Sequence, residues 1–189
     1  MKLVEIRDYA IEHGVPIMSD NSLDFISSIL NETNSRSLLE VGTAIAYSSL
    51  YIQSKVKDIS IDTLERDIDR FNVAQFNLKN IEFEHNITSI QADALKYNNK
   101  RIYDAIVIDA AKAQNIAFLR LYFAFCDKVM IIDNIDFHGY TGKSFDIKNR
   151  RLRQMVGRIE KFLEYLDKRS DLVVQKVDIG DGLLMIKRK

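Results

Sequence analysis

The sequence contains one cysteine, one proline and seven glycines among its 189 residues. A single cysteine cannot form a disulfide framework within the chain, which fits a reducing compartment. Cys126 lies in an apolar run, where we expect a small buried side chain. Few prolines and glycines leave little room for linkers, and we find no repeat or low-complexity segment. Residues 1–189 are therefore predicted to form a single domain.

An excess of charge of one sign and long apolar runs are also lacking. The 27 basic and 27 acidic residues give a formal net charge of zero, so the composition does not indicate a strongly basic nucleic-acid-binding module, although local patches matter more than totals. No apolar stretch approaches the roughly 18 residues of a membrane span. The N-terminal residues carry charges throughout and have no apolar signal core. We therefore predict a cytoplasmic protein without a membrane partner.

From residue 37 onwards, short apolar runs alternate with longer amphipathic segments. Strands are expected at 38–41, 59–64, 87–91, 105–108 and 129–132, and helices at 45–55, 67–80, 113–125 and 150–168. Two N-terminal helices, 3–13 and 20–32, precede them, and the second is expected to be capped by Ser19 or Asp20. Two last strands, 172–177 and 183–187, flank a glycine-containing turn that indicates a hairpin.

Strands that alternate with helices of this length indicate βαβ units and a parallel sheet covered on both faces. The near-continuous apolar runs 105–108 and 129–132 are typical of strands buried on both faces. In the helix 67–80, the residues Ile68, Phe71, Ala74 and Leu78 form the stripe expected to face the sheet. The predicted fold is α/β: a Rossmann-like, mostly parallel sheet with a C-terminal antiparallel hairpin, preceded by N-terminal helices within residues 1–33.

The first predicted strand leads into a glycine turn at Gly42 and then into a helix. A dinucleotide fingerprint would require glycines two and five residues later, where this chain has Ala44 and Tyr47. A ligand with a carboxylate and no pyrophosphate, such as S-adenosylmethionine, needs only the helix terminus and a hydroxyl, which Ser48 could provide. The alternative is an ordinary strand-to-helix turn.

Two further strands end in polar residues that suit a nucleoside. Glu65 follows the second strand about twenty residues after the glycine turn, where an acidic side chain can accept hydrogen bonds from both ribose hydroxyls. Asp93 and Ala94 follow the third strand, in a position to meet an adenine ring. Glu65 can also be a solvated residue near a helix start, which the helix dipole favours.

Carboxylates close the next two strands, at Asp109 and at Asp133-Asn134. If these strands are neighbours, two carboxylates and one amide oxygen meet at the same edge of the sheet, a ligand set that suits a hard cation such as Mg²⁺. Lys112 lies about one helical turn beyond Asp109 and is expected to face the same pocket. The alternatives are strand-end aspartates that cap the following segments and a solvated lysine.

Basic residues gather between positions 143 and 158, against the single acid Asp146. They are Lys143, Lys148, Arg150, Arg151, Arg153 and Arg158. Such a patch can contact RNA phosphates, or it can be a solvated helix face. Phe137, His138 and Tyr140 lie between the patch and the predicted metal residues, where an aromatic ring can stack on a base; His138 can equally be an ordinary loop histidine.

Taken together, these motifs resemble those of the metal- and S-adenosylmethionine-dependent O-methyltransferases, which include catechol and caffeoyl-CoA methyltransferases. The resemblance rests on four segments in the right order and spacing: 40–48, 63–67, 108–112 and 133–134. Segments 13–18, 151–153 and 180–183 also fit the pattern of bacterial tRNA 5-hydroxyuridine methyltransferases, which the chain resembles most. Three differences are an alanine at Ala46 instead of glycine, Gln91-Ala92-Asp93 instead of Gly-Asp, and a short N-terminus that bears on a possible homodimer.

The resemblance implies a role for each candidate residue. The cofactor S-adenosylmethionine would be held by Glu40, Gly42, Ser48, Glu65, Asp93, Ala94 and Asp109, with Met18 nearby. Mg²⁺ or another divalent cation would be held by Asp109, Asp133 and Asn134. Lys112, beside Asp109, would be the catalytic base or would orient the acceptor oxygen.

The implied reaction is Mg²⁺-dependent methylation of 5-hydroxyuridine in tRNA, with Lys148, Arg150, Arg151 and Arg153 against the phosphates. The alternatives are a catechol-type methyltransferase of small molecules and a binding module without catalytic activity.

Overall fold

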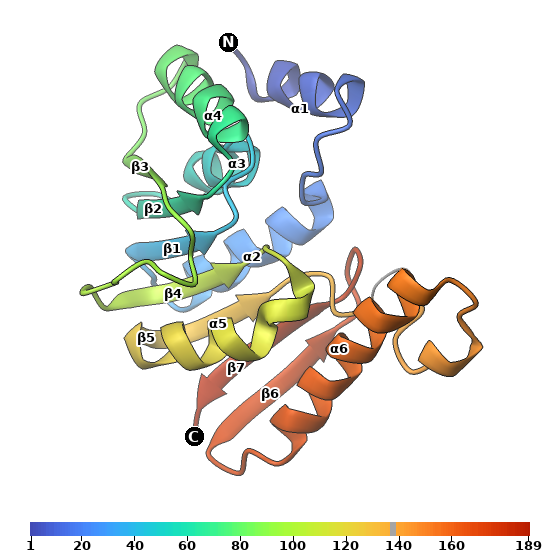
Figure 1. Cartoon of the computed structure of the whole chain (residues 1–189). Coiled ribbons are helices and arrows are strands. Elements are labelled where there is room, and N and C mark those ends of the chain that lie inside the picture. The colour runs from blue at the N-terminus through green and yellow to red at the C-terminus, as the bar shows by residue number, and fades with distance from the viewer. Residues whose placement is uncertain (137–138) are drawn as a thin grey trace.

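The computed structural model describes residues 1–136 and 139–189 and contains one seven-stranded sheet between two layers of helices (Figure 1). The strands are β1 (Ser37–Val41), β2 (Ser60–Glu65), β3 (Ile87–Gln91), β4 (Tyr103–Ile108), β5 (Cys126–Ile132), β6 (Leu172–Val177) and β7 (Leu183–Arg188). The helices are α1 (Leu3–Glu12), α2 (Asp20–Glu32), α3 (Tyr47–Lys55), α4 (Ile68–Asn80), α5 (Asn115–Tyr122) and α6 (Arg150–Asp167). Short 3₁₀ turns occur at Lys112–Gln114, Phe123–Phe125 and Ser144–Asp146.

The strand order is β3-β2-β1-β4-β5-β7-β6. The first five strands in this order pair in parallel, whereas β7 pairs antiparallel with both β5 and β6. The order reverses between β1 and β4, which are adjacent, so their carboxyl ends flank the switch point where open α/β sheets bind ligands. The Rossmann-like fold with a reversed C-terminal hairpin is confirmed.

The two faces of the sheet are covered by different helices. In β1, Leu38 packs into the core formed with α1 to α4, and the next residue, Leu39, packs into the core formed with α5 and α6. This alternation is the period of two of a strand, and burial on both faces explains the continuous apolar runs at the ends of β4 and β5. Within the described parts of the chain, no helix is both long and apolar enough to cross a membrane.

Most predicted elements are found, with two corrections, and one of the two predicted caps of α2 is confirmed. The segment 113–125 is not one helix, because α5 is flanked by a 3₁₀ turn at each end. Ile68 is 54% exposed and does not face the sheet, since the first turn of α4 extends beyond the strand ends; Ala74 and Leu78 are buried as expected. Ser19, rather than Asp20, caps α2 by accepting a hydrogen bond from the Ser22 N–H. Cys126 is buried.

At the amino ends of the parallel strands, on the side of the sheet opposite the cleft-forming ends, Asp104 of β4 connects this strand to β1 and β5. Its carboxylate accepts hydrogen bonds from the backbone N–H groups of Arg36 (2.7 Å) and Ser37 (3.0 Å) at the start of β1. It also forms an ion pair with Lys128 of β5, with Nζ 2.9 Å from Oδ1. Partial burial opposes ionisation, but these donors outweigh it and lower the pKa of Asp104 below its usual value.

We expect Asp104→Asn to lower the free energy of unfolding by about 1 to 2 kcal/mol at neutral pH. Because the folded-state pKa lies below the unfolded value of about 3.9, this stabilisation is present above that value and is lost as the pH falls through the folded-state pKa. Urea unfolding at neutral and acidic pH measures the effect. Asp127→Asn, at an exposed position of β5, is the control and should behave like wild type; a pH-independent deficit in Asp104→Asn would contradict the expectation.

Candidate functional site

A cleft of about 570 Å³ lies at the carboxyl ends of the parallel strands, a size typical of small-molecule sites. It is lined by turns that follow β1, β2, β3, β4 and β5, by the connection between α1 and α2, and by the turn between β6 and β7. The predicted site residues on its wall are Gly42, Glu65, Asp93, Ala94, Asp109, Lys112 and Asn134. The structure therefore brings together the ends of five strands, as the fold requires.

The turn after β1 requires glycine at position 42. Gly42 has a φ of +108°, and a Cβ placed there would lie 2.0 Å from the carbonyl oxygen of Asp109. The turn is fixed by a hydrogen bond from the Gly42 N–H to the Leu64 carbonyl (3.0 Å), and β4 is joined to β1 by the Asp109 N–H, which donates to the Val41 carbonyl (2.9 Å). The turn after β1, which is predicted to hold the cofactor, is therefore in direct backbone contact with Asp109, the first predicted metal ligand.

Ala46 keeps the conformation of the glycine expected at its position. Its φ is +66°, in the left-handed region, and Ala44 has a φ of +46°. Such angles cost an alanine about 1 kcal/mol each. Helix α3 starts directly after Ala46 and has no side-chain cap there, so N–H groups of its first turn remain available to an anionic group.

Glu40 lies beneath this turn and is fully buried. Its carboxylate accepts hydrogen bonds from the hydroxyls of Ser48, Ser49 and Thr63. Burial raises the pKa of Glu40, and the three hydroxyl donors partly oppose that rise. The cluster connects β1, β2 and α3.

Two of the predicted cofactor residues belong to this cluster rather than to the cleft wall. Glu40 and Ser48 are not among the residues that line the cleft, and the Ser48 hydroxyl donates to Glu40. Met18 is also buried in the core, directly after Pro16 and Ile17, which do line the cleft. Contact of these three residues with the cofactor stays a prediction. In the structure they lie behind the residues that line the cleft.

Glu65 is held at the cleft wall by two backbone donors. Its Oε2 accepts from the Ala44 N–H (2.9 Å) and its Oε1 from the Asp67 N–H (2.8 Å). A carboxylate has about four acceptor positions, so two remain for hydroxyls of a ligand. The position and preorganisation of Glu65 suit the predicted ribose contact.

Asp93 and Ala94 line the same cleft after β3. Asp93 accepts a hydrogen bond from the Leu95 N–H (3.0 Å), and the Ala94 carbonyl accepts one from the Tyr122 hydroxyl (2.6 Å). These bonds fix the turn against α5, so its backbone and the Ala94 methyl present a defined surface to the cleft.

The condition for a metal site, that β4 and β5 are neighbours, is met. Asp133 is joined to the end of β4 by its N–H, which donates to the Ile108 carbonyl (3.0 Å). Asn134 has a φ of +59°, an uncommon backbone conformation of the kind that gathers at functional sites, and its side-chain amide donates to Asp133 Oδ2 (2.7 Å). Lys112 pairs with Asp109, with Nζ 2.7 Å from Oδ1.

The two carboxylates are close enough to influence each other. Burial and the nearby negative charge of Asp109 raise the pKa of Asp133 to about 6, although the Lys112 ammonium lowers it in part. A bound cation would relieve this repulsion, and two carboxylates with an amide oxygen are ligands of a hard cation. Among the described residues, no three His, Cys, Asp or Glu side chains form a metal-binding group, so Asn134 and outside oxygens would have to complete the coordination.

Asp181 also lines the cleft; its segment, 180–183, fits the family pattern, but Asp181 was not predicted as a site residue. It lies in the turn between β6 and β7, where the Ile135 N–H donates to the Gly182 carbonyl (3.0 Å) and the Asp136 N–H donates to the Asp181 carbonyl (2.9 Å). This turn therefore folds over the end of β5. Arg66 and Arg70, at the start of α4, line the cleft as well, and only the tertiary fold places them there.

The predicted basic patch lies at the start of α6. Lys148, Arg150, Arg151 and Arg153 are all exposed, and Asn149 caps the helix by accepting from the Leu152 N–H (3.1 Å). Helix α6 packs against the Lys112–Gln114 turn, which forms part of the cleft wall, so the patch and the cleft are connected through this helix. Tyr140 is 42% exposed, whereas Phe137 and His138 lie outside the described residues.

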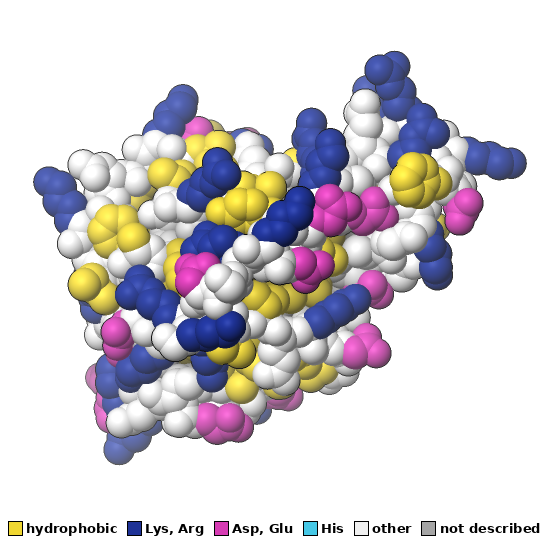
Figure 2. Space-filling view, turned by 90° about the horizontal axis from the view of Figure 1, so that it is seen from below, with side chains coloured by type: hydrophobic (Ala, Val, Ile, Leu, Met, Phe, Trp, Pro, Cys, Tyr) yellow, Lys and Arg dark blue, Asp and Glu magenta, His cyan; other side chains and the backbone are white. Residues whose placement is uncertain are grey.

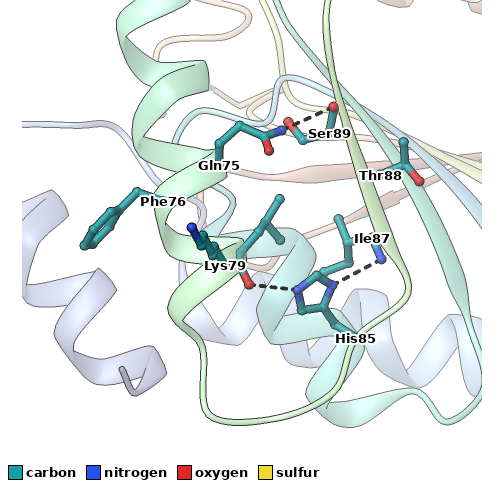
Figure 3. Close-up of a pocket in the computed structure, with 8 residues that line it drawn as sticks. Gln75, Phe76, Lys79, His85, Ile87, Thr88 and Ser89 are labelled. Atoms are coloured by element: carbon teal, nitrogen blue, oxygen red, sulfur yellow. Dashed lines mark hydrogen bonds between the residues drawn. The ribbon is translucent and has the colours of Figure 1, made fainter.

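A second cavity, of about 640 Å³, lies beside the edge strand β3 and under α4 (Figure 3). Its histidine is fully engaged: the Ile87 N–H donates to His85 Nδ1 (3.3 Å), so Nε2 carries the proton and donates to the Leu78 carbonyl (2.9 Å). None of the described residues that line it is a carboxylate. The chemistry therefore points to the cleft at the strand ends and not to this cavity.

The chain matches the family model of the O-methyltransferases over residues 1–189. It is 24% identical over 185 residues to a caffeoyl-CoA O-methyltransferase-like protein of Arabidopsis thaliana, covering 94% of this chain and 78% of that protein. A similarly described protein of Staphylococcus aureus has a solved structure with a TM-score of 0.92 and 32% identity, covering 99% of this chain and 92% of the other. An O-methyltransferase of Bacillus cereus, solved with S-adenosylhomocysteine, has the same fold, with a TM-score of 0.82 and 20% identity over 99% and 90% of the two chains.

Proposed function

The chain belongs to the O-methyltransferase family, and from this we propose that it methylates the hydroxyl of 5-hydroxyuridine in tRNA in a Mg²⁺-dependent reaction. The family model and the relatives reported above are O-methyltransferases, and solved structures with the same fold hold S-adenosylmethionine or S-adenosylhomocysteine. The observation that carries the proposal is the exposed basic start of α6 together with a cleft lined by Asp109 and Asn134, with Asp133 buried directly behind them. A cleft so arranged offers a divalent-cation site and a surface for phosphates side by side.

The reaction forms one bond between the acceptor oxygen and the methyl carbon and breaks the bond between that carbon and the cofactor sulfur, while the hydroxyl loses its proton. When bound, a divalent cation supplies positive charge that lowers the pKa of a neighbouring hydroxyl. Asp109, Asp133 and Asn134 would hold it. Gly42 lets the cofactor turn approach the end of β4 closely, which brings methyl donor and acceptor into range.

Lys112 is held by its ion pair with Asp109. In the charged form its ammonium donates to the acceptor oxygen and orients it; in the neutral form it accepts the hydroxyl proton. The side chain is only 14% exposed, so its hydrogen bonds are made away from bulk water and orient the acceptor strongly.

Support for tRNA as the acceptor comes from charge. Lys148, Arg150, Arg151 and Arg153 neutralise phosphates if RNA lies across the start of α6, and each contact releases counterions and makes binding salt-dependent. A small catechol is too short to reach these residues and the cleft at once, so activity on it should not depend on them.

Labelled S-adenosylmethionine with Mg²⁺ and tRNA that contains 5-hydroxyuridine tests the proposal. We expect the label to enter the tRNA, and we expect a chelator to abolish the transfer. Charge reversal, Arg150→Glu with Arg151→Glu, should lower tRNA methylation at least ten-fold, because two phosphate contacts become repulsions. The matched control is Lys168→Glu, at the far end of α6 about 27 Å away.

The possible results separate the candidates. Label in a simple catechol but not in tRNA would assign a small-molecule acceptor. Transfer to tRNA that is unaffected by the charge reversals would contradict the phosphate contacts. Transfer that persists with chelator would contradict the role of the divalent cation.

A further inference from the structure

Phe145 is the most exposed large hydrophobic residue that the structure describes. Its side chain is 94% exposed, compared with 71% for the next, Ile11. A phenyl ring in water forgoes about 2 kcal/mol of burial free energy, so the fold gains nothing from Phe145 in the free protein. A single exposed hydrophobic side chain is common on protein surfaces, so a partner is indicated by the way Phe145 is anchored and by the charges near it.

The segment that presents Phe145 is anchored on both sides of the ring. Ser144 and Ile147 are buried, and the Glu160 carboxylate on α6 accepts from the Gly142 N–H (2.9 Å) and the Ser144 N–H (3.2 Å). The Ser144 hydroxyl donates to the same carboxylate. The ring is therefore held outward by the structure of its neighbours, and little conformational entropy is lost when a partner binds it.

The surroundings of the ring are cationic. Lys143, Lys148, Arg150 and Arg151 are exposed around Phe145, with Asp146 as the acid among them. Figure 2 shows several Lys and Arg side chains on the lobe that projects at the right, around a hydrophobic patch that also has Asp and Glu side chains beside it. A π-face between cations complements a nucleic acid, whose bases stack on aromatic rings while its phosphates pair with lysine and arginine.

We propose that Phe145 is a stacking platform for an unpaired base of the RNA substrate, beside the nucleotide that enters the cleft. The inference rests on the proposed function in taking RNA as the partner, and adds that the recognised RNA is single-stranded at this point. The projecting segment supports this: it follows the predicted metal ligands Asp133 and Asn134 and is tied to the strand end by Thr141, whose hydroxyl donates to the Ile135 carbonyl (2.8 Å).

Equilibrium binding of the full chain to two synthetic RNAs tests the proposal: a stem-loop with a single-stranded loop, and a fully paired duplex of equal length. We expect Phe145→Ala and Phe145→Leu to weaken stem-loop binding about ten-fold or more, and Phe145→Tyr to bind like wild type. Duplex binding should be the same for all four proteins. The slope of affinity against salt should not change, because no phosphate contact is removed.

Leucine separates stacking from general apolar contact, because it keeps the apolar bulk and lacks a π-face. Wild-type affinity in Phe145→Leu, equal losses on both RNAs, or no binding of either RNA by the wild type would each overturn the proposal. Binding to anionic lipid vesicles that Phe145→Ala removes and Phe145→Leu keeps would assign the ring to a membrane surface instead. Thermal unfolding of the variants should match wild type, since the ring packs against little of the fold.

Binding is measured without methyl transfer, so the two proposals can fail separately. Stem-loop binding that depends on Phe145, without any methylation of 5-hydroxyuridine, would overturn the proposed acceptor and keep the platform. Methylation of tRNA with unchanged stem-loop affinity in Phe145→Ala would keep the acceptor and overturn the platform.

Discussion

Replacing Gly42 with alanine is expected to lower the free energy of unfolding by about 4 kcal/mol or more, enough to unfold a marginal domain. The added Cβ would lie 2.0 Å from the backbone carbonyl oxygen of Asp109 and 2.8 Å from its carbon. No side-chain rotation can relieve this overlap, because the added Cβ meets backbone atoms directly after the paired strands β1 and β4. Either β1 and β4 separate locally or the turn moves, and both changes displace Asp109.

Two other glycines separate the overlap from the backbone conformation. Gly14 also has a positive φ, +62°, but open space around its Cβ position, so Gly14→Ala should cost only about 1 kcal/mol. Gly157, within α6, has neither a positive φ nor an atom within 4 Å of an added Cβ. Gly157→Ala should therefore stabilise the protein by up to about 1 kcal/mol. Urea unfolding of the three variants gives the comparison. A Gly42→Ala variant as stable as Gly14→Ala would mean that the contact between the two strand ends is easily relaxed.

The second large effect is expected for Asp133→Asn, which should lower methyl transfer about a thousand-fold or more by weakening the proposed divalent-cation site. Without metal, the same change should raise the free energy of unfolding by about 1 to 3 kcal/mol. The reason is that burial and Asp109 raise the pKa of Asp133 to about 6, so its charge destabilises the folded protein at neutral pH. Since the raised folded-state pKa lies above the unfolded value of about 3.9, the gain grows as the pH rises through this window.

Three measurements check this prediction: calorimetric titration with Mg²⁺, unfolding in the presence of chelator, and methyl transfer. Asp127→Asn, at the exposed opposite end of β5, is the control and should change none of them. An Asp133→Asn variant that is more stable and inactive would show that the carboxylate is kept for function at the expense of stability. Full activity in this variant would remove Asp133 from the site.

The order and type of the elements could be predicted because the buried strands are almost wholly apolar and each is followed by a polar turn. For this reason, β4 and β5 could be recognised from the apolar runs 105–108 and 129–132. The exposure of Ile68 could not be predicted, because helical periodicity shows which residues share a face but not how far the sheet extends beneath them. The division of the segment 113–125 into α5 and its 3₁₀ turns depends on how α5 connects to β5. This connection is also determined by the tertiary fold.

The site was predicted where the chain order determines it. Residues at the ends of parallel strands must meet at one edge, which placed Asp109, Asn134 and Glu65 on the same cleft. Ser48 shows what the sequence leaves open: its hydroxyl had two acceptors in reach, a ligand or Glu40, and the structure has it donating to Glu40. Asp181 was missed because the path of the terminal hairpin over β5 is not encoded in its local pattern.

Two segments that are far apart along the chain line the cleft: the connection between α1 and α2, with Pro16 and Ile17, and the β6–β7 turn, with Asp181. Gly180 places the β6–β7 turn directly against α2, because a Cβ added at this glycine would lie 2.4 Å from the Ser22 hydroxyl. Local opening of either segment would open the cleft, so a ligand that binds only the closed form opposes both openings. Cofactor binding should therefore slow amide hydrogen exchange in the α1–α2 connection and in the β6–β7 turn together.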